Sequence, residues 1–286
     1  MSEHSMPEDS SLEFAPRLLE ALKKARWCGR EYNYNSLLRG VEERPLAEKP
    51  LVSVIIALSH IDAAVLGHLT VLVTERGFPF ELVLVDTAGV AQQEARYRNI
   101  ADIYLEAAPE SAFYTALNLG ALYARAPFLL VLSDLVCPTV ELVRQHFEAY
   151  HQHKCLAARG DVSEVPWLLQ VPVGSLLKGG PARPWFIDID ENFSIKKSVF
   201  YSLKGFDETL HPGCGALELS IRLYKLARQG KTLLQRYLPK AQCRASRSFD
   251  YPARQTAYVK SWIMVDEKYH EQLYEYCLIA TERCGN

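Results

Sequence analysis

Polar side chains end three apolar segments of this chain. Ser59 closes the segment 51–59, Asp86 closes 81–86, and Ser133 with Asp134 follows 128–132. A carboxylate can accept strong hydrogen bonds from hydroxyl and ring N–H groups, and carboxylates with phosphates and water hold Mg²⁺ or Mn²⁺. Each aspartate could equally cap the turn that follows it. These positions are therefore candidates for ligand binding, provided that the fold brings them together.

The elements around these residues predict that they share one edge of a sheet. The apolar, β-branched segments 51–59, 81–86 and 128–132 indicate buried strands, and 101–105 is a shorter candidate. Helical periodicity separates them over 62–76 and 111–124. Strands that alternate with helices predict a parallel sheet, and ligands bind beyond the carboxyl ends of such strands.

The remaining segments extend this α/β unit at both ends. We expect helices at 11–29, 140–150, 217–229 and 256–279, short strands at 168–172, 186–195 and 232–237, a disordered start at 1–10, a connector at 30–50 and irregular chain over much of 155–195. The resulting division is 1–49 as start, helix and connector, 50–249 as one domain with halves 50–138 and 139–249, and 250–286 as a helical extension.

Composition excludes several classes of function. The 286 residues are 49% hydrophobic and 23% charged with a net charge of −2, so no basic excess indicates a nucleic-acid partner. No apolar run reaches the ~18–20 residues that span a bilayer, and the polar, acidic N-terminus does not resemble a signal peptide. Seven cysteines without C-x-x-C spacing predict reduced thiols. We expect a cytoplasmic protein.

Several short motifs carry a resemblance to a known family. They are Val85-Asp86-Thr87-Ala88-Gly89, Ala116-Leu117-Asn118-Leu119-Gly120, Asn192, Lys196-Lys197, Gly205-Phe206-Asp207, and Leu219 with Arg222. Over residues 50–245 the chain resembles family 2 glycosyltransferases of the GT-A fold. The resemblance implies an α/β nucleotide-diphospho-sugar transferase fold, with a mostly parallel central sheet flanked by helices and extra N- and C-terminal helices.

The resemblance also implies two binding regions. The donor, a nucleotide-diphosphate sugar, would lie over Ser59, Asp86, Asn118, Ser133 and Asp134, and the acceptor near Asn192 and Asp207. The family's Asp-x-Asp metal motif falls on Leu132-Ser133-Asp134, so its first acid is missing. A single Asp134 would then hold Mn²⁺ or Mg²⁺ weakly, with the phosphates as further ligands. The family's late histidine falls on Ala245, and Arg244 or Arg247 could neutralise phosphate instead.

The catalytic base of the family is replaced as well. Its acidic pair falls on Gly215 and Ala216, and alanine cannot accept a proton. Glu218 and Asp190 are the candidate substitutes, with Asp188 and Glu191 close by in sequence; each could instead have a surface or capping role. An active enzyme would be an inverting transferase with a non-standard base.

Two functions follow from the resemblance. The first is a nucleotide-sugar-dependent glycosyltransferase that transfers sugar to a glycan or other hydroxyl acceptor in surface polysaccharide assembly. The alternative is a catalytically inactive nucleotide- or glycan-binding or scaffold protein on the same fold. The terminal helices are candidates for a contact between two copies of the chain. A nucleotidyltransferase is disfavoured because residues 59–62 contain no glycine-rich phosphate loop.

Overall fold

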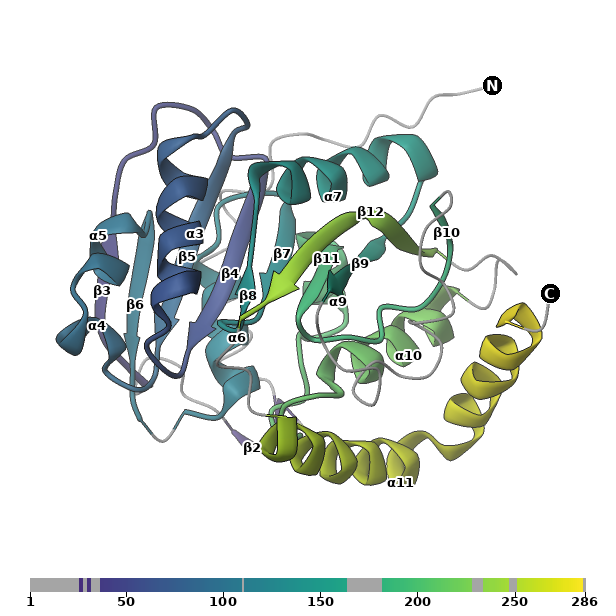
Figure 1. Cartoon of the computed structure of the whole chain (residues 1–286). Helices are drawn as coiled ribbons and strands as arrows, with labels where there is room; N and C mark the ends of the chain where they lie inside the picture. The colour runs from purple at the N-terminus through teal and green to yellow at the C-terminus, as the bar shows by residue number, and fades with distance from the viewer. Residues whose placement is uncertain are drawn as a thin grey trace.

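A computed structural model describes residues 26–27, 30–31, 37–109, 111–163, 182–227, 234–246 and 251–284. Its centre is a ten-stranded sheet (Figure 1). In spatial order the strands are β10 (Arg183–Pro184), β12 (Gln235–Ala245), β9 (Ala157–Ser163), β11 (Asn192–Lys196), β7 (Phe128–Leu132), β4 (Val52–Leu58), β5 (Phe80–Asp86), β6 (Ile103–Ala107) and β3 (Leu38–Glu43), with β8 (Val136–Cys137) paired to β12. A separate hairpin joins β1 (Arg26–Trp27) to β2 (Arg30–Glu31).

The middle of the sheet is parallel and its flanks are mixed. Strand β4 pairs in parallel with both β5 and β7, and β5 pairs in parallel with β6. Every residue of β4 and β5 is buried, as their mostly apolar composition predicts. Strand β11 lies antiparallel between β7 and β9, and β3 closes the far edge antiparallel to β6. The carboxyl ends of β4 and β7 therefore lie side by side.

Helices cover both faces of this sheet (Figure 1). The first layer contains α3 (Ala63–Thr74), α4 (Val90–Gln93), α5 (Arg96–Ile100) and α7 (Val140–His153). The second contains α6 (Phe113–Tyr123), α9 (Lys197–Ser202), α10 (Gly215–Ala227) and the long α11 (Tyr251–Cys284). Alternation along β4 divides the core, because Val54 and Ile56 pack in the first layer whereas Ile55 and Ala57 pack in the second.

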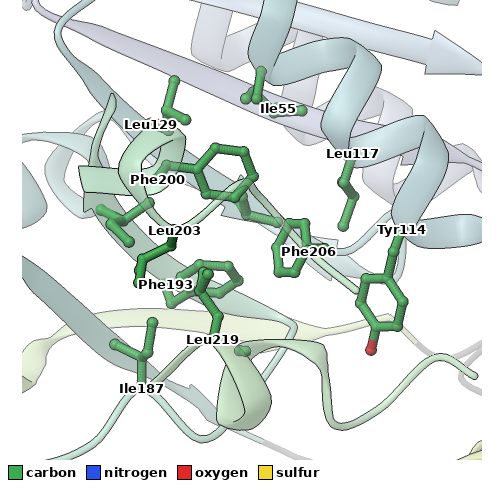
Figure 2. Packing of buried hydrophobic residues seen from close by; sticks show 14 of the residues in the cluster. Ile55, Tyr114, Leu117, Leu129, Ile187, Phe193, Phe200, Leu203, Phe206 and Leu219 are labelled. Atoms are coloured by element: carbon green, nitrogen blue, oxygen red, sulfur yellow. The ribbon is translucent and has the colours of Figure 1, made fainter. Parts of the chain in front are cut away.

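An aromatic cluster in the second layer joins the two halves of the chain. Phe206 packs against Tyr114 of α6, Phe193 of β11 and Phe200 of α9, with ring centroids 5.2, 5.9 and 5.3 Å away (Figure 2). All four side chains are buried. Aromatic pairs at these separations add to the free energy of area burial. The turn that carries Phe206 is thereby fixed against α6, β11 and α9.

The structure corrects several sequence-based expectations. Residues 38–43, expected in a connector, form β3, whose sequence LRGVEE lacks the apolar run of a central strand because it is an edge. Residues 157–163, expected to be irregular, form β9. The charged Arg159 breaks the apolar pattern of a strand, and it is buried because Asp188 neutralises it.

Other differences concern the ends of elements. Strand structure occupies 192–196 rather than 186–195, and the last strand runs over 235–245 rather than 232–237. Residues 26–27, expected to be helical, are extended. The expected strand at 168–172 and the expected structure of 1–25 lie outside the described residues. No helix of the described part is long and apolar enough to cross a membrane.

Close packing of α6 on the sheet generates a stability prediction. A Cβ on Gly120 would lie 2.6 Å from Ile55 Cγ2 and 3.1 Å from Val85 Cγ2, whereas a Cβ on Gly67 of α3 would meet nothing within 4 Å. We expect Gly120→Ala to lower the free energy of unfolding by about 1–3 kcal/mol through overpacking. The matched control Gly67→Ala should raise it by roughly 0.5–1 kcal/mol. Urea unfolding of both variants measures the difference, and equal effects would contradict the packing.

Candidate functional site

The carboxylate of Asp134 lies beyond the carboxyl end of β7, beneath residues that follow β4. Its Oδ2 accepts hydrogen bonds from the backbone N–H of Ser59 at 2.8 Å and from the Ser59 hydroxyl at 2.6 Å, and it lies 3.1 Å from His60 Nδ1. Burial alone would raise the pKa of Asp134, but the hydrogen bonds from His60 and Ser59 outweigh burial and hold that pKa below its ordinary value. Asp134 is therefore a buried anion.

The loop that carries Ser59 and His60 is fixed at its far end. Asp62 caps α3 by accepting from the N–H groups of Ala64 at 2.8 Å and Val65 at 3.1 Å, and it also contacts the hydroxyl of Ser246 after β12. Sequence reasoning singled out Ser59 but missed His60. The signal was present, because His60 directly follows Ser59 at the strand end where ligands are expected.

Asp86 closes a turn rather than facing a ligand. Oδ1 accepts from the N–H groups of Ala88 and Val90 at 3.1 and 2.9 Å, and Oδ2 accepts from Ala91 N–H at 2.8 Å and from the Tyr104 hydroxyl at 2.7 Å. The side chain is buried. Two hydrogen bonds on each oxygen saturate a carboxylate. This geometry favours the capping alternative over the predicted contact with the donor.

Ser133 links the end of β7 to the segment before β11. Its backbone N–H donates to Glu191 O at 3.2 Å, and its hydroxyl accepts from Leu135 N–H at 3.2 Å. The hydroxyl is buried and serves the turn after β7. Through this contact the segment 188–191 lies directly beside Ser133 and Asp134. The structure thus brings Ser59, Ser133 and Asp134 together and sets Glu191 against Ser133, whereas the Asp190 carboxylate contacts Tyr114, Gly213 and Ala216. Asp86 lies at the end of the neighbouring strand β5.

Asn118 and the Gly205-Phe206-Asp207 turn are mutual partners. The Asn118 amide donates to Phe206 O at 3.1 Å and to Glu208 Oε1 at 2.7 Å, and its carbonyl oxygen accepts from Phe206 N–H at 2.9 Å. All of these groups are buried. Asn118, predicted to bind the donor, therefore holds the Gly205-Phe206-Asp207 turn against α6.

The start of α10 is bound by a side-chain pair from elsewhere in the chain. Asp190 Oδ1 accepts from Ala216 N–H at 2.7 Å, and Oδ2 accepts from Gly213 N–H at 2.7 Å and from the Tyr114 hydroxyl. The Tyr114 oxygen also accepts from the N–H groups of Gly213 and Gly215 at 3.0 and 2.7 Å. These acceptors satisfy N–H groups that a helix start leaves without intrahelical partners, and a carboxylate there is favoured by the helix dipole.

The same contact explains why residue 215 is a glycine. A Cβ at position 215 would lie 2.2 Å from Cε1 and 2.4 Å from Cζ of the Tyr114 ring. Tyr114 thus occupies the space that a larger side chain at position 215 would need. Two buried groups, Tyr114 and Asp190, contact Gly215 and Ala216 from α6 and from the segment before β11.

Glu218 and Asp207 are engaged by the C-terminal helix. Glu218 Oε2 accepts from Arg222 Nε at 2.9 Å, and Oε1 accepts from the Tyr269 hydroxyl at 2.7 Å with Lys268 Nζ 3.7 Å away. Asp207 Oδ2 accepts from Lys268 Nζ at 2.7 Å. Glu218 is fully buried and Asp207 nearly so. This arrangement disfavours Glu218 as a base and Asp207 as an acceptor contact.

Asn192 lies in the core of the sheet. Its amide donates to Asp161 O and Ala241 O, both at 2.9 Å, so its carbonyl oxygen is the atom that faces His146 Nε2 at 2.9 Å. The Asn192 side chain is fully buried. All of its polar atoms thus join strands β9, β11 and β12 to α7, and none faces an acceptor.

The described residues at the carboxyl ends of β4 and β7 do not form a divalent-cation site from protein side chains alone. Leu132, at the first acidic position of the metal motif, is fully buried in the core. Among the described residues no group of three or more His, Cys, Asp or Glu side chains could hold a metal ion. Asp134 Oδ2 already accepts from Ser59 and faces His60. Hard cations bind through several oxygen ligands, so a single carboxylate whose Oδ2 is already engaged would be a weak site.

Comparison with solved structures identifies the fold. The mannosyltransferase PcManGT from Pyrobaculum calidifontis, in complex with GDP-Man and Mn²⁺, is 16% identical with a TM-score of 0.58, and the match covers 91% of this chain and 72% of that one. The glucosyl-3-phosphoglycerate synthase from Mycobacterium tuberculosis, with Mn²⁺, UDP and phosphoglyceric acid, is 12% identical with a TM-score of 0.54, covering 92% and 84%.

A third match agrees with these two. S. aureus TarS 1-349 in complex with UDP-GlcNAc is 15% identical with a TM-score of 0.51, and the match covers 72% of this chain and 60% of that one. No protein-family model matches, and no curated protein sequence matches. The predicted GT-A fold is confirmed by the structural neighbours, which are glycosyltransferases, while the identities of 12–16% carry no conclusion about activity.

Burial of His146 generates a prediction about pH. Burial lowers the pKa of His146 to about 4, although its hydrogen bond to Asn192 opposes that shift. The unfolded chain, with a histidine pKa near 6.5, therefore binds the extra proton first, and stability falls as the pH drops from about 6.5 to about 4. The loss attributable to His146 is on the order of 3 kcal/mol.

Replacement of His146 isolates this effect. We expect His146→Gln to show a shallower decline in the free energy of urea unfolding between pH 6.5 and 4 than the unsubstituted protein. The control His151→Gln changes an exposed histidine of the same helix and should leave the slope unchanged. Parallel curves for the His146 variant and the unsubstituted protein would show that the ring is not held neutral.

Proposed function

We propose that this protein is a nucleotide-sugar-dependent glycosyltransferase of the family 2 type, which transfers a sugar to a hydroxyl acceptor on a glycan or similar molecule. The observation that carries the proposal is the hydrogen bond from Ser133 N–H to Glu191 O. This bond joins Ser133, the neighbour of Asp134, to Glu191, the neighbour of Asp190. The fold that the chain shares with nucleotide-sugar enzymes supports the same function.

Asp190 fits the role of base better than Glu218 does. Within the described part of the chain, Asp190 Oδ1 accepts one hydrogen bond, from Ala216 N–H, and a carboxylate oxygen can accept two. It is also hydrogen-bonded to the residue that replaces the family's base. Both oxygens of Glu218, by contrast, face Arg222, Lys268 or Tyr269.

The proposed reaction needs one proton transfer at this carboxylate. The acceptor hydroxyl oxygen forms a bond to the anomeric carbon of the donor, and the bond from that carbon to the diphosphate oxygen breaks. The nucleoside diphosphate leaves, and the proton of the acceptor hydroxyl moves to Asp190 Oδ1. General-base catalysis of this kind contributes roughly 10²–10⁴-fold to a rate.

A non-catalytic donor- or glycan-binding protein is the second candidate. It is favoured by the burial of both candidate bases, since Asp190 is 2% and Glu218 0% exposed. In this case Asp190 only caps α10. The described part of α11 also exposes Val259 and Ile263, one helical turn apart, so the proposed contact between two copies through this helix is compatible with either function.

Turnover with nucleotide sugars separates the two candidates. We expect release of UDP or GDP from at least one of a panel of UDP- and GDP-sugars when glycan acceptors are present. Asp190→Asn should lower kcat by roughly 10²–10⁴-fold and leave donor binding, measured by calorimetry, unchanged. Donor binding without turnover for the unsubstituted protein would establish the non-catalytic alternative.

Glu218→Gln is the matched control for this experiment. It changes a buried carboxylate of α10, the helix that Asp190 caps, to an isosteric amide and should lower stability by breaking the contact with Arg222, a loss visible in a thermal melt. At temperatures where the variant is folded, kcat should remain within a few-fold of the original value. A kcat that falls with Glu218→Gln but not with Asp190→Asn would reverse the assignment of the base.

A further inference from the structure

Helix α11 packs against α10 and against the turn that precedes it (Figure 1). A Cβ on Gly213 would lie 3.0 Å from Tyr258 Cα and 3.2 Å from Tyr258 Cβ, and Cys214 Sγ donates to Tyr258 O at 3.7 Å. The N–H of the same Gly213 donates to Asp190 Oδ2 at 2.7 Å. One residue, Gly213, therefore touches both Tyr258 of α11 and the carboxylate that is the proposed base.

The hydroxyl of Tyr258 makes no hydrogen bond to another described residue, although it belongs to a side chain packed against the Gly213 turn. Burial raises the pKa of this hydroxyl above its ordinary value, and Cys214 and the acids of the segment 188–191 raise it further. The hydroxyl thus keeps its proton at neutral pH and can both donate and accept. Partly buried polar groups normally have partners, so this hydroxyl beside the proposed base indicates a contact with a ligand.

Tyr258 is one member of an aromatic pair at the surface of α11. Trp262 lies one helical turn further on, with ring centroids 5.9 Å apart and ring planes at 32°. Both residues are partly exposed, and the neighbouring Val259 and Ile263 are 50% and 52% exposed. The face of an aromatic ring is electrically negative, so it attracts C–H bonds that carry a partial positive charge. A sugar ring presents such C–H bonds on its face and hydroxyl groups around its edge.

Resting on the proposed function, we propose that Tyr258 and Trp262 bind the sugar acceptor. Their rings contact the C–H face of the sugar, and the Tyr258 hydroxyl bonds to one of its hydroxyl groups while another donates to Asp190 Oδ1. Aromatic walls with a few placed polar groups are the usual composition of a binding site for a small molecule. The contacts predicted at Asn192 and Asp207 are disfavoured because both side chains are engaged within the protein.

The carboxylates beside the rings favour a neutral sugar over other occupants. An apolar helix face from a second copy of the chain would bring no donor to Asp190 Oδ1, which can accept a second hydrogen bond. Covering a carboxylate without supplying a donor costs free energy. An anionic sugar would be repelled by the acids of the segment 188–191. A neutral sugar unit supplies hydroxyl donors and adds no negative charge.

An array of neutral and acidic oligosaccharides tests this inference on the full chain. We expect binding to at least one neutral oligosaccharide, and calorimetry with that compound should show that Tyr258→Phe and Trp262→Ala each raise Kd by about tenfold or more. Tyr258→Phe removes a hydroxyl that bonds to no described residue, so its melting temperature should equal that of the unsubstituted protein. The matched control Tyr274→Phe removes a hydroxyl from a tyrosine of the same helix that is 62% exposed, and Kd should change by less than about threefold.

The possible results separate this inference from the proposed function. A Kd that neither Tyr258→Phe nor Trp262→Ala changes would overturn the inference and leave the transferase proposal to its own test, the release of UDP or GDP. Binding that needs both side chains, without turnover of any nucleotide sugar, would support the sugar site and count against the transferase.

Two further results would overturn the sugar site. One is the absence of binding to every oligosaccharide of the array, with and without UDP or GDP. The other is a dimer of the unsubstituted protein that Trp262→Ala converts to a monomer while oligosaccharide binding stays the same, because a second copy would then cover these rings. If Trp262→Ala melts early, Tyr258→Phe alone decides.

Discussion

The fold depends on hydrogen-bond acceptors for the buried backbone N–H groups at the start of α10. Helix N-termini leave N–H groups without intrahelical partners, and inside a protein those groups need acceptors. Asp190 and Tyr114 supply them for Gly213, Gly215 and Ala216. Since Tyr114 comes from α6 and Asp190 from the segment before β11, this one cluster fixes the start of α10 to two other parts of the fold.

Most of the motif residues that predicted the fold make the contacts between α6, α10 and the Gly205-Phe206-Asp207 turn. Asn118 binds both the N–H and the carbonyl of Phe206, and Arg222 donates to Gly205 O at 2.7 Å and pairs with Glu218. The Asn118 contacts are buried and join segments far apart in the chain, and the part-buried Arg222 joins α10 to the turn at Gly205. Such groups are costly to leave unpaired, so their partners must be present together. The match of these residues to the family motifs therefore indicates the fold and says little about the reaction.

The sequence predicted the parallel centre of the sheet well, because β4, β5 and β7 are buried on both faces and read as apolar runs. It failed at β3 and β9, where an edge position and a buried ion pair hide the strand pattern. The candidate site was harder. Tyr114 acts on a residue 99 positions away, and no local pattern reveals such a contact.

Both carboxylates that transfer chemistry could use are held by three donors, and this is what allows them to be buried. An ionised carboxylate away from water is tolerated only when hydrogen bonds replace its hydration. For Asp134 all three donors converge on one oxygen, and two of them come from groups at the surface. For Asp190 they are divided, two on Oδ2 and one on Oδ1.

Because their hydrogen bonds are distributed differently, Asp134 and Asp190 differ in what they can still bind. An acceptor hydroxyl that donates to Asp190 Oδ1 adds a hydrogen bond to an oxygen that can still accept one, so the cap on α10 persists while the proton is transferred. A metal ion at Asp134 Oδ2 would instead have to remove existing bonds. The proposed base can therefore lie beside Gly215 and Ala216 without uncapping α10, whereas Asp134 Oδ2 is already held by Ser59 and His60.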